Sequence, residues 1–156
     1  MEPIVRFVKI KPIRVAVFHA EGKSPEPEAY NKMKVWAELK GLIKEPWINL
    51  VFGNNNPMPT PGKEEYGYDC KIAIPPDMEL SEGVSEGEIP GGLYIVVRTN
   101  LANITQMWMW LYNWAETEGF HVKGHGVEEH LTDMGVPETM LLDLWLPVAE
   151  PGEQVK

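Results

Sequence analysis

The chain has 156 residues, of which 44% are hydrophobic and 24% are charged, a balance typical of a folded globular domain rather than a disordered or fibrous one. Its 14 Lys and Arg residues against 23 Asp and Glu residues give a net charge of −9 with His neutral. Because this field repels a phosphate backbone, we expect no direct binding of nucleic acid. The same field attracts small cations, which makes cationic ligands the first partner class to consider.

The start of the chain does not resemble an export signal, because Arg6 and Lys9 interrupt its apolar residues. The most apolar stretch, residues 107–115, is far shorter than the roughly 20 residues that cross a bilayer. The one cysteine, Cys70, cannot form an internal disulfide. We therefore expect a cytoplasmic protein without a membrane partner.

The first half of the chain predicts the order β-α-β-β. β-branched and aromatic residues at 13–19 indicate a strand. A helix follows, for which Ser24 is the predicted N-cap, Pro25 the first helical residue and Gly41 the stop. Two extended segments come next, at 47–52 and 66–74.

The second half predicts the same order. Glycines at 83, 87, 91 and 92 indicate a turn-rich linker before a strand at 93–98. Asn103 or Thr105 would cap the next helix and Gly119 would end it. Extended segments are predicted at 126–131 and 141–148.

A repeated string supports this duplication. W-A-E-x-x-G-[L/F] starts at Trp36 and again at Trp114, 78 residues later. Two copies of one β-α-β-β unit are therefore predicted, at about 5–76 and 83–148. Each unit leaves sheet surface that its one helix cannot cover, so the copies should pair. We predict an α+β fold with antiparallel sheets, two long helices and a ligand pocket at the repeat junction.

The second predicted helix is too apolar to have one ordinary solvent-facing side. Ile104, Trp108 and Leu111 belong to one stripe, while Trp110 and Trp114 continue the apolar surface round a second side. These extra aromatic residues either pack against the rest of the fold or line a cavity.

Six strings in this order resemble the GyrI-like, or AraC-type effector-binding, small-molecule-binding domain, which is itself a duplicated β-α-β-β. The resemblance covers nearly the whole chain as a single stand-alone domain. The strings are AYNKM at 29–33, YGYD at 66–69, IPGGLY at 89–94, LYNW at 111–114, GVEEHLTD at 126–133 and LWLPV at 144–148.

The resemblance implies an aromatic-lined cavity that captures hydrophobic, often cationic small molecules, with an acid at its base that matches Glu128. Glu129 alternates to the other face of its strand. A cation would offset the cost of burying the carboxylate, and aromatic faces would add to its binding. The chain departs from the family where His130 replaces a frequent tyrosine. The expected ligand-binding residues are Glu128, Tyr30, Phe52, Tyr68, Trp108, His130 and Trp145.

Two other functions remain open at this point. In a hydrolase of strained electrophiles, Glu128 would activate water while Tyr30 or Tyr68 steadies the electrophile. In a protein-interaction regulator of the gyrase-inhibitor type, the acidic surface would engage a basic partner. A weak homodimer is also left open.

No cofactor or metal is expected. The histidines near Glu128 do not have the spacing of a known zinc motif, and His19 is interpreted as a structural residue. No glycine-rich phosphate loop or nucleophilic serine motif is recognisable.

Overall fold

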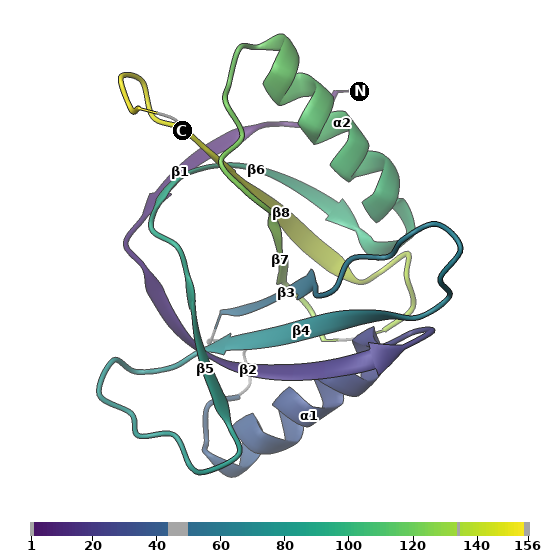
Figure 1. Ribbon diagram of the computed structural model, residues 1–156, viewed down its shortest axis with the longest axis vertical. Helices are drawn as coiled ribbons and strands as arrows, with labels where there is room; N and C mark the ends of the chain where they lie inside the picture. The colour runs from purple at the N-terminus through teal and green to yellow at the C-terminus, as the bar shows by residue number, and fades with distance from the viewer. Residues whose placement is uncertain (1, 44–49, 134, 155–156) are drawn as a thin grey trace. The chain divides into compact units, whose positions relative to one another are not determined.

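The structure is a computed structural model that describes residues 2–43, 50–133 and 135–154. It divides into two compact units. The first unit is Ile13–Ile89, and the second unit combines Met1–Pro12 with Pro90–Lys156. Each unit is an antiparallel sheet with one α-helix of 14 residues, so the predicted α+β fold class is confirmed (Figure 1).

In the first unit, α1 packs against the two central strands of a sheet in the order β3-β4-β2-β5. Its elements are β2 (Ile13–Gly22), α1 (Glu26–Leu39), β3 (Val51–Asn55), β4 (Tyr66–Ala73) and β5 (Ser85–Ile89).

In the second unit, α2 packs against β6 and β8 of a sheet in the order β1-β6-β8-β7. Its elements are β1 (Arg6–Ile10), β6 (Gly92–Asn100), a 3₁₀ turn (Leu101–Asn103), α2 (Ile104–Thr117), β7 (Val127–His130) and β8 (Leu141–Val148).

The predicted repeat is confirmed in the helices. The 78-residue offset of the repeated string also carries Glu26 onto Ile104 and Leu39 onto Thr117, which are the first and last residues of α1 and α2. Gly41 and Gly119, which follow the two helices, have φ of 70° and 81°. Glycine suits these positions because this left-handed backbone strains other residues.

The sequence analysis missed β1 and β5, the strands that precede the two repeats. β1 pairs with β6 and β5 pairs with β2, so each leading strand joins the sheet of the other repeat. Gly87, assigned above to a linker, lies inside β5. A Cβ there would lie 2.8 Å from the Val17 side chain, which explains a glycine in a strand.

The predicted cap of the first helix was wrong, because Pro25 and not Ser24 is the N-cap of α1, and no side chain caps that end. Asn103 is the N-cap of α2, as one of the two predicted alternatives had it, but its side chain makes no capping hydrogen bond. The backbone N–H of Asn103 donates to the side chain of Asn100, 3.0 Å away. Within the extended segment predicted at 47–52, β3 begins at Val51, and residues 47–49 lie outside the described residues.

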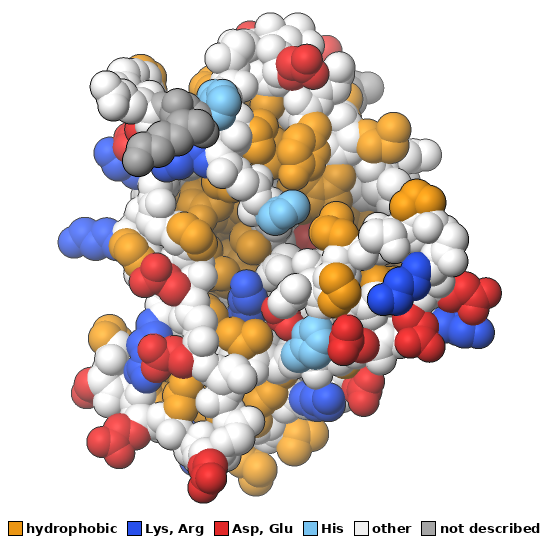
Figure 2. All heavy atoms as spheres, viewed as in Figure 1, with side chains coloured by type: hydrophobic (Ala, Val, Ile, Leu, Met, Phe, Trp, Pro, Cys, Tyr) orange, Lys and Arg blue, Asp and Glu red, His pale blue; other side chains and the backbone are white. Residues whose placement is uncertain are grey.

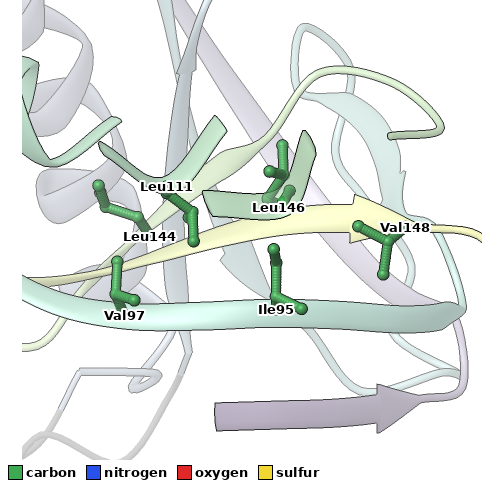
Figure 3. Close-up of a cluster of buried hydrophobic side chains, with 7 residues drawn as sticks. Ile95, Val97, Leu111, Leu144, Leu146 and Val148 are labelled. Carbon is green, nitrogen blue, oxygen red and sulfur yellow. The ribbon is translucent and has the colours of Figure 1, made fainter. Parts of the chain in front are cut away.

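The core of the second unit lies between α2 and its sheet. Figure 3 shows aliphatic side chains of β6 and β8 that point to the same side, with Leu111 of α2 among them. Burial of each such side chain contributes roughly 1.5–3 kcal/mol. The fully buried members are Ile95, Val97, Leu111, Ala115, Leu144, Leu146 and Val148.

The extra tryptophans of α2 pack within this unit. Trp110 stacks on Trp114 with ring centroids 6.4 Å apart, and Trp114 stacks on Phe120 at 5.7 Å. Phe7 of β1 contacts both Trp114 and Phe120. Packing therefore accounts for these aromatic residues.

The face drawn in Figure 2 is mixed in charge, with acidic side chains spread among basic and apolar ones. Among the described residues, no helix has the length and apolar character needed to pass through a membrane.

Candidate functional site

The expected ligand-binding residues divide between the two units. Tyr30, Phe52 and Tyr68 belong to the first unit. The second unit contains Trp108, Glu128, His130 and Trp145, and it therefore holds both the expected acid and two of the expected aromatic residues.

The pairing of β7 with β8 decides which way the two neighbouring glutamates point. Glu128 lies opposite Leu144, and Glu129 lies opposite Asp143. Residues directly opposite in an antiparallel pair share a face of the sheet, and Leu144 is in the core under α2. Glu128 therefore faces α2, whereas Glu129 is on the face opposite α2.

Glu128 interacts with the helix above it. The indole N–H of Trp108 donates to the Glu128 carboxylate, with Nε1 and Oε1 3.3 Å apart. Gly126 makes room for this indole, because a Cβ at that position would lie 2.4 Å from Trp108 Cη2. Trp108 and Glu128 are thus neighbours, and they lie between helix and sheet.

His130 lies on the same face as Glu128 and is only 2% exposed. Burial lowers the pKa of this imidazole to about 4, so it is neutral at physiological pH. Its role is therefore that of a neutral buried side chain rather than a cation.

Glu129 interacts with the other predicted aromatic residue. The indole N–H of Trp145 donates to the Glu129 carboxylate, with Nε1 and Oε1 3.1 Å apart. Tyr94 packs edge-on against Trp145, with ring centroids 5.4 Å apart. Val96 and Val127 both lie opposite Trp145, and all of these apolar side chains are buried, with Val96 fully buried and Trp145 7% exposed. We call the surface formed by Tyr94, Val96, Val127, Glu129 and Trp145 the Glu129 face.

The pKa of Glu129 is raised above its ordinary value, chiefly by burial and then by the negative charge of Asp143. The Trp145 hydrogen bond and the guanidinium groups of Arg6 and Arg98 oppose this shift without cancelling it. The surroundings of Glu129 therefore disfavour its negative charge, and a cation placed beside it would relieve that cost.

Two arginines hold Asp143 in place next to Glu129. Arg98 donates from Nε to Oδ1 at 3.0 Å and from Nη2 to Oδ2 at 3.3 Å, and Arg6 donates to Oδ2 at 2.6 Å. Asp143 is only 3% exposed. Because its carboxylate takes hydrogen bonds from both guanidinium groups, Asp143 is a paired ion, in contrast to Glu129. Arg6 comes from β1, which the sequence analysis did not predict, so no sequence signal linked it to this site.

In the first unit, two of the expected residues are part of the packing around α1. Tyr30 and Tyr68 are each 2% exposed. Tyr68 shares a sheet face with Phe18, which packs on Trp36 of α1. Phe52 is on the opposite face, directly across from Lys71, and is fully buried. The structure thus separates Phe52 from the two tyrosines.

A groove of about 950 Å³ runs beside α1 in the first unit. It contains none of the expected ligand-binding residues. Its lining is largely apolar, with an ion pair between Glu28 and Lys32 at its edge. The lining residues are Phe18, Ser24, Pro27, Glu28, Asn31, Lys32, Val35, Trp36 and Leu39.

Comparison with known families gives one match over most of the chain. A family model described as GyrI-like small molecule binding domain matches residues 4–149. YosT, an SPbeta prophage-derived protein of Bacillus subtilis (strain 168) named as a candidate transcriptional regulator, is 24% identical over 87% of this chain and 93% of its own length. A DNA gyrase inhibitor of Cronobacter sakazakii is 24% identical over 58% of this chain, and the match spans only 59% of the inhibitor.

Solved structures of similar fold have low sequence identity. The C-terminal domain of EcmrR is 13% identical with a TM-score of 0.69, covering 96% of this chain and 99% of that one. A hydrolase from Listeria innocua is 11% identical with a TM-score of 0.61, covering 93% and 91%. SAV2435 bound to tetraphenylphosphonium is 11% identical with a TM-score of 0.53, covering 96% and 94%. At these sequence identities, the three similarities show a shared fold and nothing further.

Proposed function

Since the chain belongs to the GyrI-like small molecule binding domain family, we propose that it captures hydrophobic, cationic small molecules on the Glu129 face. The observation that carries this proposal is the half-buried carboxylate of Glu129 beside the indole of Trp145, 3.1 Å from its N–H. Aromatic faces and a desolvated anion are together the groups that attract an organic cation.

The pairing of the charged groups supports a cation over an anion. The two arginines nearest to the site are engaged by Asp143, whereas the Glu129 carboxylate accepts one side-chain hydrogen bond from the residues that the structure describes. Its raised pKa means that ionised Glu129 has lost part of its hydration without full compensation. A bound cation would supply that compensation.

This proposal differs in one residue from the expectation drawn from the family resemblance, which favoured Glu128. Glu128 faces α2 and accepts a hydrogen bond from Trp108 of that helix. A ligand at Glu128 would have to enter between α2 and the sheet, where the core of the unit is packed. A ligand at Glu129 leaves that core intact.

The ligand bound to SAV2435 provides a suitable probe, tetraphenylphosphonium. We expect it to change the tryptophan fluorescence of this protein saturably. Triphenylphosphine oxide, which is apolar and aromatic but neutral, should bind at least about tenfold more weakly, a difference of roughly 1.4 kcal/mol. Equal affinity for the two compounds, or a fluorescence change that never saturates, would remove the basis for a cation site.

The Glu129→Gln variant tests whether the charge of Glu129 recognises the cation. Gln keeps the length and can still accept the Trp145 hydrogen bond, but it has no charge. We expect this variant to lose the preference for tetraphenylphosphonium over the neutral compound. A preference that survives the substitution would show that another group recognises the charge.

A further inference from the structure

Two arginines and two acids share the side of the sheet on which the Glu129 face lies. Arg98 lies opposite Asp143 in the pairing of β6 with β8, and Asp143 lies opposite Glu129 in the pairing of β8 with β7. These three residues form one row, in which neighbouring strands are about 4.8 Å apart. Arg6 of β1 lies opposite Val96, which is two residues from Arg98 on β6. All four charged side chains therefore belong to one side of this sheet.

The charges of these four groups balance, but they are not evenly paired. The buried carboxylate of Asp143 accepts hydrogen bonds from both guanidinium groups. Since one negative charge cannot neutralise two positive charges, the arginines keep an excess positive charge. The matching negative charge is that of ionised Glu129, whose carboxylate accepts a hydrogen bond from Trp145. The site therefore presents charges of both signs to a ligand.

The arginines also keep hydrogen-bond donors for a ligand. A guanidinium group has about five N–H donors. Arg98 uses Nε and Nη2 for Asp143, and Arg6 uses Nη2. Within the part of the chain that the structure describes, Nη1 of both arginines has no hydrogen-bond partner. The Arg6 and Arg98 side chains are 45% and 58% exposed, so a ligand can approach them from solvent.

Asp143 holds the Arg98 guanidinium group in one orientation. The Nε–Oδ1 and Nη2–Oδ2 hydrogen bonds occupy one edge of the guanidinium plane, so Nη1 is directed away from Asp143. A donor that is already oriented loses less conformational entropy when a ligand binds. The hydrogen bond and charge of Asp143 also raise the pKa of Arg98, which keeps this side chain charged. Asp143 is thus a positioning residue for Arg98.

Exposure changes along the row from Arg98 to Glu129. Arg98 is at the exposed end, Glu129 is half-buried, and Trp145 beside Glu129 is 7% exposed. A hydrophobic group gains most where water is excluded, whereas a carboxylate pays least for desolvation where water remains. The cationic aromatic part of a ligand therefore fits beside Glu129, and an anionic part fits beside the arginines.

We propose that this site selects zwitterionic ligands, namely hydrophobic cations that also carry a carboxylate. The inference rests on the proposed function, in which Glu129 recognises the cation, and adds that Arg98, with Arg6 beside it, recognises the carboxylate. A simple cation adds a positive charge to four groups whose charges already sum to zero. A zwitterion adds no net charge and places each of its charges beside a group of opposite sign.

Two matched compounds test the proposal, carboxybutyl-triphenylphosphonium and its methyl ester. They share the aromatic cation and the alkyl chain, but at pH 7 only the acid has a carboxylate. The ester is more apolar, and the net charge of −9 repels a carboxylate, so both general effects favour the ester. We nevertheless expect calorimetric titration to show that the acid binds at least about threefold more tightly. Equal affinity, or tighter binding of the ester, would overturn the proposal.

Variants test which residue recognises the carboxylate. Arg98→Gln leaves Asp143 paired with Arg6. The preference for the acid should disappear in this variant, while unchanged ester binding shows that it is folded. Lys9→Gln is the control, because it removes the same charge from β1 on the other side of the sheet, where neighbouring Phe7 contacts α2. A preference that persists in Arg98→Gln, or disappears equally in Lys9→Gln, would contradict recognition by Arg98.

The same titrations separate this inference from the proposed function. Glu129→Gln should weaken the binding of both compounds and keep the preference for the acid, because different residues recognise the two charges. If the ester binds to the wild-type protein and the acid gains nothing, only the selection of zwitterions is wrong. If neither compound binds, the cation site itself is wrong.

Discussion

Glu128 and Glu129 are consecutive residues of β7 whose carboxylates accept hydrogen bonds from indole groups on opposite faces of the sheet. Trp108 of α2 donates to Glu128, and Trp145 of β8 donates to Glu129. One acid is thereby joined to the helix-covered core, and the other belongs to the Glu129 face. This division underlies the predictions that follow.

Glu129 is expected to reduce stability at neutral pH. Its pKa is raised in the folded protein, so its ionised form is less favourable there than in the unfolded chain. Below the ordinary glutamate pKa this loss of stability is absent. It grows as the pH rises through the pKa that Glu129 has in the folded protein. Glu129→Gln should therefore raise Tm at pH 7 by roughly 1–3 °C, measured by calorimetry. The gain should vanish near pH 4; a Tm below wild type at pH 7 would contradict this account.

His130 should make the protein less stable in acid. Its folded pKa is about 4 against an ordinary value of 6.5, so the unfolded state binds the proton first as pH falls. The free energy of unfolding should decrease from pH 6.5 to pH 4 by up to about 3 kcal/mol from this residue. Urea titrations at several pH values should show a flatter dependence for His130→Gln. The matched change at exposed His125, His125→Gln, should leave the pH dependence as in wild type.

Substitution of Gly53 should destabilise the protein, because the Tyr68 side chain occupies the space that a Cβ at residue 53 would need. A Cβ at residue 53 would lie 1.9 Å from the Tyr68 hydroxyl oxygen and 2.4 Å from Cζ. Gly53→Ala should therefore cost about 1–3 kcal/mol of unfolding free energy through overpacking. Gly124→Ala is the control, since a Cβ there meets nothing within 4 Å. If both variants unfold at the same urea concentration, Tyr68 does not pack as described.

The repeat made much of the fold predictable. Cap and stop residues located both helices, a string repeated at a 78-residue spacing showed that they correspond, and β8 was predicted at its observed bounds. β5 was missed because its sequence, SEGEI, has little β-propensity and forms a strand only through pairing with β2. The N-cap of α1 is Pro25 and not the predicted Ser24, and the sequence pattern did not distinguish between these two neighbouring positions.

The site was less predictable than the fold. Strand alternation shows that Glu128 and Glu129 face opposite ways, but which one shares a face with Trp145 depends on the register of β7 against β8. Arg6 and Asp143 are 137 residues apart in sequence and meet only through strand pairing. Interactions of this kind arise from tertiary pairing, which no local pattern encodes.

The central claim, that Glu129 is the acid that recognises a cationic ligand, is tested most directly by calorimetric titration of tetraphenylphosphonium into wild type, Glu129→Gln and Glu128→Gln. The two variants remove the same charge from neighbouring positions of one strand. The account predicts that Glu129→Gln weakens binding by at least about tenfold and that Glu128→Gln changes it by less than about threefold. Weaker binding in Glu128→Gln with wild-type affinity in Glu129→Gln would contradict it.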